Sequence, residues 1–136
     1  MKHRVFNQLI FLAVAMVLFV VCRTTPVFNV KDATIHTASG KEPTLEDVTK
    51  AIVSASTNST PAWNMTVVKP GHIVATLNNR THMAQVDINY TTKGYSITRK
   101  DSADLQYDAE KGTIHPSYNK WIQILDSNIR AKVSML

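Results

Sequence analysis

A single cysteine offers the most specific chemistry in this sequence. Cys22 stands at the end of an uninterrupted apolar run, Leu9 to Val21, and is followed by Arg23 and a polar chain. A lone thiol at such a junction is a candidate for acylation. Val21 departs from the small residue that usually precedes an acylated cysteine. The alternative is therefore a cysteine that acts as a small hydrophobic side chain.

Histidines and acids are the next residues that could do chemistry. None of the histidines stands at metal-ligand spacing from a second ligand, so we predict no metal and no cofactor. His72 and His82 could face each other across a hairpin, although we favour solvated positions on the sheet for both. His115 could act as a base with Asp101 or Asp104, which requires these groups to lie within hydrogen-bond reach. We expect the acids to be solvated and predict no catalytic residue.

Aromatic and cationic side chains gather in the C-terminal half. They could line a groove for an anionic or sugar-like ligand, and its residues would be Tyr95, Arg99, Lys100, Tyr107 and Lys120. In the simpler interpretation, which we favour, Tyr118 and Trp121 belong to the core and each carries a polar tip.

The apolar run that precedes the cysteine predicts export. The chain opens with the cationic stretch Met1-Lys2-His3-Arg4, and the run itself has 13 residues. A spanning helix needs about 20 apolar residues, whereas the apolar part of an export signal needs about 7–15. We predict a signal peptide over residues 1–21. Counting the apolar neighbours of the run leaves an uncleaved anchor as an alternative.

Composition excludes several classes of protein. The chain has 136 residues, a formal net charge of +5 and 44% hydrophobic residues, which is typical of a small globular domain. The positive charge is too mild and too scattered to predict nucleic-acid binding. One cysteine excludes a disulfide framework and a multi-cysteine metal site.

Two amphipathic helices are predicted at the ends of the folded part. Thr44 can cap the first helix, in which apolar residues recur at Leu45, Val48, Ile52 and Ala55. Pro116 suits the first turn of the second helix. Its apolar stripe consists of Tyr118, Trp121, Ile122, Leu125, Ile129 and Val133.

Between the helices, apolar residues alternate with polar ones in four stretches separated by turn sequences. The stretches are 63–67, 73–77, 84–90 and 95–98. They predict a four-stranded antiparallel meander, and both helices should cover its apolar face in a two-layer α+β sandwich. Short strands could add at 27–30 and 112–115. We expect residues 22–43 to form an extended tether and residues 44–136 to form the domain.

The chain resembles a known group of proteins at two places. Its stretch Cys22-Arg23-Thr24-Thr25-Pro26 is similar to the mature start, Cys-Arg-Thr-x-Pro, of an uncharacterised family of small lipoproteins from Gram-negative bacteria. The C-terminal half is similar to the same family through Tyr95-Ser96-Ile97, Asp101-Ser102, Leu105, Tyr107, Ile114-His115, Tyr118-Asn119-Lys120-Trp121-Ile122 and Leu125-Asp126. The resemblance implies that Cys22 is acylated. Because Arg23 replaces the Asp associated with inner-membrane retention, it also implies the outer membrane.

Together these patterns predict an exported lipoprotein of the cell envelope with a non-enzymatic binding or structural role. Its partners would be the membrane, through the lipid anchor, and an unknown envelope protein or component. One alternative is a soluble periplasmic ligand-binding or inhibitor module, released by an ordinary signal peptidase near residue 25. Another is a small envelope hydrolase that uses His115.

Overall fold

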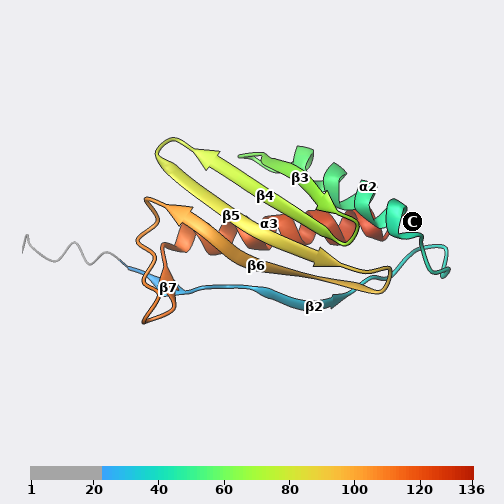
Figure 1. Ribbon diagram of the computed structural model, residues 1–136, viewed down its shortest axis with the longest axis horizontal. Coiled ribbons are helices and arrows are strands. Elements are labelled where there is room, and N and C mark those ends of the chain that lie inside the picture. The colour runs from blue at the N-terminus through green and yellow to red at the C-terminus, as the bar shows by residue number, and fades with distance from the viewer. Residues whose placement is uncertain (1–22) are drawn as a thin grey trace, which may run out of the picture.

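Five antiparallel strands form the main sheet of the computed structural model, which describes residues 23–136 (Figure 1). Their order across the sheet is β2 (Val30–Thr34), β6 (Gly94–Ala103), β5 (His82–Tyr90), β4 (His72–Asn79) and β3 (Trp63–Lys69). Strands β3 to β6 follow one another as a meander, and β2 lies beside β6 at one edge. The four meander strands confirm the alternating pattern in the sequence.

Apolar and polar residues alternate along the strands, so the sheet has one apolar face. In β4 the side chains of Ile73, Ala75 and Leu77 are fully buried, while the residues between them are half-buried. The register aligns Ile73 with Ile88 of β5, and Ile88 with Ile97 of β6. Apolar side chains therefore form continuous rows across the strands, which is how a sheet stabilises its covered face.

Both predicted helices are present, and both cover this apolar face. Helix α2 (Leu45–Ala55) and helix α3 (Pro116–Val133) lie behind the sheet in the view of Figure 1. The buried side chains of sheet and helices form one core cluster. In α3 the buried residues are those of the predicted stripe: Tyr118, Trp121, Ile122, Leu125, Ile129 and Val133.

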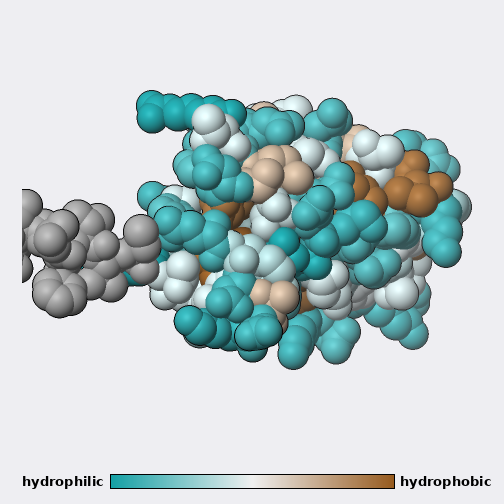
Figure 2. All heavy atoms as spheres, turned by 60° about the vertical axis from the view of Figure 1, so that its left-hand side comes forward, coloured by the Kyte–Doolittle hydropathy of each residue, from teal (hydrophilic) through white to brown (hydrophobic). Residues whose placement is uncertain are grey.

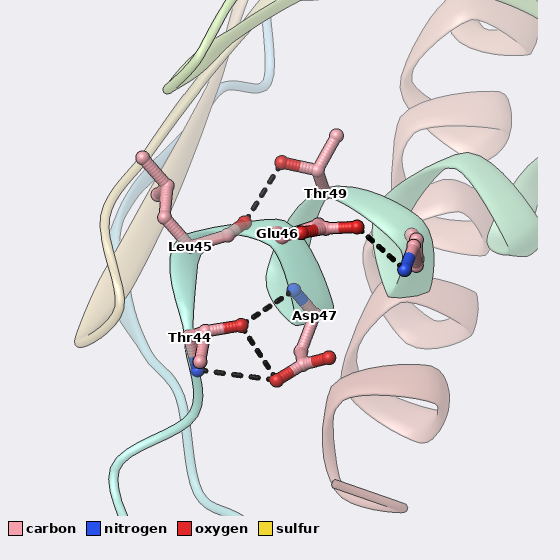
Figure 3. A network of polar contacts seen from close by, with 6 residues as sticks. Thr44, Leu45, Glu46, Asp47 and Thr49 are labelled. Atoms are coloured by element: carbon pink, nitrogen blue, oxygen red, sulfur yellow. Dashed lines mark hydrogen bonds and ion pairs between the residues drawn. The ribbon is translucent and has the colours of Figure 1, made fainter.

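Helix α2 begins with a reciprocal cap (Figure 3). The Thr44 hydroxyl accepts a hydrogen bond from the Asp47 backbone N–H at 3.1 Å, and the Asp47 carboxylate accepts from the Thr44 backbone N–H at 3.3 Å. The Asp47 carboxylate accepts hydrogen bonds from the hydroxyl and from the backbone N–H of Thr44, and these bonds, the first more than the second, lower the pKa of Asp47. Glu46 in the same first turn pairs with Lys50, one turn further along the helix, at 2.7 Å. A 3₁₀ turn, η1 (Ser56–Asn58), follows the helix.

The predicted number of four strands is wrong, because the segment expected to be a tether supplies a fifth. Val30, Ala33 and Ile35 are buried in the core. The register shifts between Val30 and Ala33, and Asp32 adopts a positive φ of 46° within this bulge. Because of the bulge, Val30 and Ala33 both face the core although they are three positions apart. The sequence of this strand therefore lacks the alternation of apolar and polar residues that marks a regular strand.

Two further short strands form a separate ladder at one end of the sheet. Strand β1 (Thr25–Pro26) pairs with β7 (Thr113–Ile114) in antiparallel register. The expected strand at 112–115 therefore exists, but it pairs with the start of the described chain instead of extending the main sheet. The expected strand at 27–30 is not formed as such, since β1 ends before it and β2 begins at its last residue.

Candidate functional site

The first described residues are fastened to the start of α3 by one asparagine. The Asn119 side-chain amide donates to the Thr25 hydroxyl at 3.0 Å and to the Pro26 carbonyl at 2.7 Å. Its carbonyl oxygen accepts from the Phe28 backbone N–H at 2.8 Å. The folded body thus begins at Thr25, three residues after Cys22.

Two more hydrogen bonds hold the same segment, residues 25–29, to other parts of the fold. The Val27 backbone N–H donates to the Gly112 carbonyl at 2.9 Å, and the Asn29 side chain accepts from the Arg99 backbone N–H at 3.0 Å. We use the name entry end for the part of the fold formed by residues 23–29, which include β1, together with β7, the turn at 80–81 and the loop 104–112. The predicted signal peptide and Cys22 lie outside the described residues.

Tyr95, the first residue of the hypothetical ligand groove, is a core residue. Its side chain is 2% exposed, and its hydroxyl donates to the Asp126 carboxylate at 2.5 Å. Burial, together with the hydrogen bond to Asp126, raises the pKa of Tyr95 far above its ordinary value. Arg130, one turn along α3, pairs with the same carboxylate at 3.0 Å. Tyr95 therefore joins the sheet to the middle of α3.

Arg99 and Tyr107 are the two groove residues that the structure brings together. The Arg99 guanidinium lies 3.3 Å from the centre of the Tyr107 ring, and it also donates to the Ser102 hydroxyl at 2.8 Å. A bulge in β6 makes this possible, because Lys100 is an extra residue opposite the step from Gln85 to Val86 in β5. It pairs Arg99 with Val86 and Ser102 with Ala84, so both side chains lie on the covered side of the sheet.

A buried phenol lies beneath this pair. Tyr118 is fully buried, and among the described residues its hydroxyl has no hydrogen-bond partner. Burial raises the pKa of Tyr118, while the positive charge of nearby Arg99 acts in the opposite direction. Of these three residues, only Tyr118 belongs to the core, and Tyr107 is exposed.

The last two groove residues lie elsewhere. Lys100 is on the uncovered side of the sheet, where it lies 3.5 Å from the Asp87 carboxylate; His72 contacts the same carboxylate at 2.6 Å. Lys120 is exposed on α3. The five residues therefore do not share one groove. Strand pairing distributes them over two faces of the sheet and one helix.

The histidines and acids that could do catalysis take structural roles. His82 donates through Nδ1 to the Asp104 carbonyl at 2.6 Å, and the Asp104 carboxylate accepts from the Thr81 hydroxyl. His115 accepts through Nδ1 from the Ser117 backbone N–H at 3.1 Å and so caps α3. Asp104 thus stabilises the neighbouring turn, and His115 stabilises the start of its own helix.

The proposed pairing of His72 with His82 does not occur. His72 is opposite Asn89 and His82 is opposite Asn79, at the two ends of the β4–β5 hairpin. The ring of His82 instead stacks on that of His115, with 6.1 Å between the ring centres. Within residues 23–136 no three metal-ligating side chains come together.

Surface grooves occur at the end opposite to the entry end. One groove, of about 450 Å³, is largely apolar and lies between the start of α2 and the end of β3. Two others, of about 420 and 460 Å³, lie near the turn that joins β5 to β6. None of the three includes a residue of the hypothetical groove except Tyr95, which lines the last of them.

Asn119 and Asn29 position the entry end, and no sequence pattern predicts these roles. Their partners lie more than 60 residues away in the chain, so no local spacing reveals them. His115 followed by Pro116 was a detectable signal for the start of α3, because Pro is favoured at the first helical position.

Comparison with known proteins supplies no relative. No family model, no curated protein and no solved structure matches this chain. The resemblance to small Gram-negative lipoproteins therefore stays a prediction. Among the helices of residues 23–136, none has the length and apolar character needed to cross a membrane.

Proposed function

We propose that this chain is an exported lipoprotein of the bacterial cell envelope, held to a membrane through Cys22, whose domain binds an envelope partner without catalysing a reaction. The observation that carries the proposal is the position of the first fastened residue. The leader-like run ends at Val21, and the body begins at Thr25. The chain therefore changes from leader to folded domain within three residues, and Cys22 lies at that boundary.

The hydrogen bonds of the polar residues support the non-catalytic part of the proposal. Asp104, His115 and Tyr95 each make the hydrogen bonds of a structural residue. A catalytic base needs a free nitrogen or oxygen directed at a substrate. These groups instead satisfy a turn, a helix start and a contact between the sheet and α3.

The structure also weighs against release by cleavage near residue 25. Such a cut would fall in β1, remove the hydroxyl of Thr25 from Asn119 and shorten the ladder with β7. Cleavage before Cys22 would leave all of these contacts in place. We therefore favour a mature chain that begins at Cys22.

Metabolic labelling with radioactive palmitate tests the anchor. The full chain and its Cys22→Ala variant are expressed in a Gram-negative host, and cells are separated into membrane and soluble fractions. We expect label on the wild-type chain alone, and the wild-type chain in the membrane fraction. Equal labelling of both chains would contradict the proposal. An intact mass that begins near residue 25 would support the soluble alternative.

A further inference from the structure

Two exposed aromatic side chains stand at the entry end. Phe28 is 37% exposed and Tyr107 is 40% exposed. The other exposed large hydrophobic residues are aliphatic, namely Val67, Val68 and Met135. Tyr is enriched where proteins meet the lipid headgroups of a membrane, because its ring is amphipathic, and Phe is common on the apolar faces of segments that lie in this interface.

A chain of contacts fixes both aromatic residues in the same part of the fold. The backbone of Phe28 is bonded to Asn119, and the next residue, Asn29, is bonded to the backbone of Arg99. The Arg99 side chain in turn lies against the ring of Tyr107. These two aromatic residues, from segments about 80 positions apart, therefore belong to one region of the surface.

The length of the connecting chain limits how far this region can be from a membrane. Thr25 is three residues after Cys22, and three fully extended residues span at most about 11 Å. The ten-residue strand β6 alone is about 33 Å long, because a strand rises roughly 3.3 Å per residue. An acyl group on Cys22 would consequently hold the entry end, and not the opposite end, at the lipid surface.

The charge of the entry end indicates which lipid chemistry it fits. Exposed cations at Arg23, Arg80 and Lys111 are balanced by acids in the same region, Asp104, Asp108 and Glu110. Figure 2 brings this end forward and shows small hydrophobic areas among hydrophilic side chains. Such a mixed surface fits the polar interface of a bilayer without requiring anionic lipids.

We propose that the entry end is a membrane-seating surface, in which Phe28 and Tyr107 enter the lipid headgroup layer beside the anchor. The inference rests on the proposed function, since it needs an acyl group on Cys22. It fixes the orientation of the domain. The turns between β3 and β4 and between β5 and β6, together with the grooves beside them, point away from the membrane.

Tryptophan quenching by brominated phosphatidylcholine tests this orientation. Phe28→Trp and Tyr107→Trp place a probe at the entry end, and Val68→Trp places a matched probe on an exposed residue of β3 near the opposite end. Each full chain is produced in a Gram-negative host, purified with its anchor and reconstituted into vesicles. The native Trp63 and Trp121 are buried and give the same background in every variant, which the wild-type chain measures.

We expect bromine near the headgroups to remove most of the added fluorescence of the two entry-end probes, with a blue shift of their emission. The Val68→Trp probe should keep its fluorescence. Equal quenching at both ends, or quenching of the Val68→Trp probe alone, would overturn the orientation. So would the absence of quenching from all three probes in acylated protein.

The intact mass of each purified chain distinguishes failure of the membrane-seating surface from failure of the proposed lipid anchor. An acylated chain without preferential quenching refutes the seating surface and leaves the proposed function standing. A chain without an acyl group refutes both. Two probes at the entry end keep the test valid if one substitution prevents folding.

Discussion

At the scale of single residues, one polar side chain holds the first described segment to the start of α3. Asn119 uses both its donor and its acceptor groups on residues that lie more than 90 positions earlier. Each of these hydrogen bonds replaces a hydrogen bond to water and adds about 1 kcal/mol to the stability of the fold. Removing one partner costs more, because the other group is then left partly buried without a hydrogen bond. Asn119 is therefore the residue that decides whether the start of the domain is fixed.

We predict that Asn119→Ala lowers the free energy of unfolding by about 1–3 kcal/mol, because it leaves three polar groups of the first segment without their partner. Urea denaturation measures the change, and hydrogen exchange should show faster exchange of the Phe28 amide. Gln123→Ala, an exposed change on the same helix, is the control. Equal effects of the two substitutions would contradict the role of Asn119.

Two buried tyrosines should respond differently to loss of their hydroxyl. Tyr95→Phe removes a hydrogen bond to the Asp126 carboxylate and should cost about 1–2 kcal/mol of stability. Tyr118→Phe removes a buried hydroxyl that has no partner among the described residues, and should leave stability unchanged or raise it. Parallel urea titrations compare them. A larger loss in Tyr118→Phe than in Tyr95→Phe would show that this account of the core is wrong.

The same tyrosines predict an alkaline limit of stability. Burial raises the pKa of both phenols in the folded state, so the unfolded chain loses its phenol protons first. Their contribution is complete below the unfolded pKa of about 10 and is lost as pH rises toward the folded values. Unfolding titrations between about pH 8 and pH 11 should show this loss. The double Tyr→Phe variant at positions 95 and 118 should show a smaller one.

At the scale of elements, local signals are enough to start the helices. Thr44 and Asp47 form their cap within four residues, and Pro116 fits the first turn of α3. In contrast, strand β2 depends on a partner about 60 residues away and carries a bulge, so its sequence has no regular alternation. This difference explains why the helices were located correctly and one strand was missed.

Thr44→Ala should weaken α2 by about 1 kcal/mol, because the side-chain bond to the Asp47 amide is lost. Lys50→Gln on the same helix is the matched control. It breaks only the ion pair with Glu46, whose two partners are both largely exposed and whose contribution is therefore small. Thermal unfolding of both variants measures the difference. A control variant as unstable as Thr44→Ala would mean that the cap adds little.

At the scale of the whole molecule, the segment between residue 25 and α2 belongs to the folded domain. Its strand β2 covers the edge of β6, and Val30, Ala33 and Ile35 bury their side chains in the core. A flexible tether would contribute no such contacts. The domain is therefore continuous with the proposed anchor, and this continuity is the basis of its fixed orientation.

Deleting residues 23–35 should abolish cooperative unfolding or cause aggregation, because it removes buried apolar side chains and exposes the edge of β6. Deleting only Arg23 and Thr24, which are exposed, should leave the unfolding temperature unchanged. Size-exclusion chromatography and thermal unfolding compare the two deletions. Normal folding of the longer deletion would mean that the segment is a tether after all.

Parts of the candidate site could be predicted and parts could not. Tyr118 and Trp121 were expected in the core from their helical spacing, and both are buried there. The stacking of Arg99 on Tyr107 depends on a bulge in the pairing of β5 with β6, together with a loop in which Asp104 and Gln106 have positive φ. No sequence pattern encodes those turns, so the grouping of the groove residues was not predictable.

The sequence by itself determined the two helices, the meander between them and the leader-like run, because each depends on signals within a few consecutive residues. Only the tertiary structure decided that β2 joins β6, that Asn119 fastens the first strand and that Tyr95 contacts Asp126. These choices join residues far apart in the chain. Their stability comes from packing and hydrogen bonds that exist once the layers have assembled.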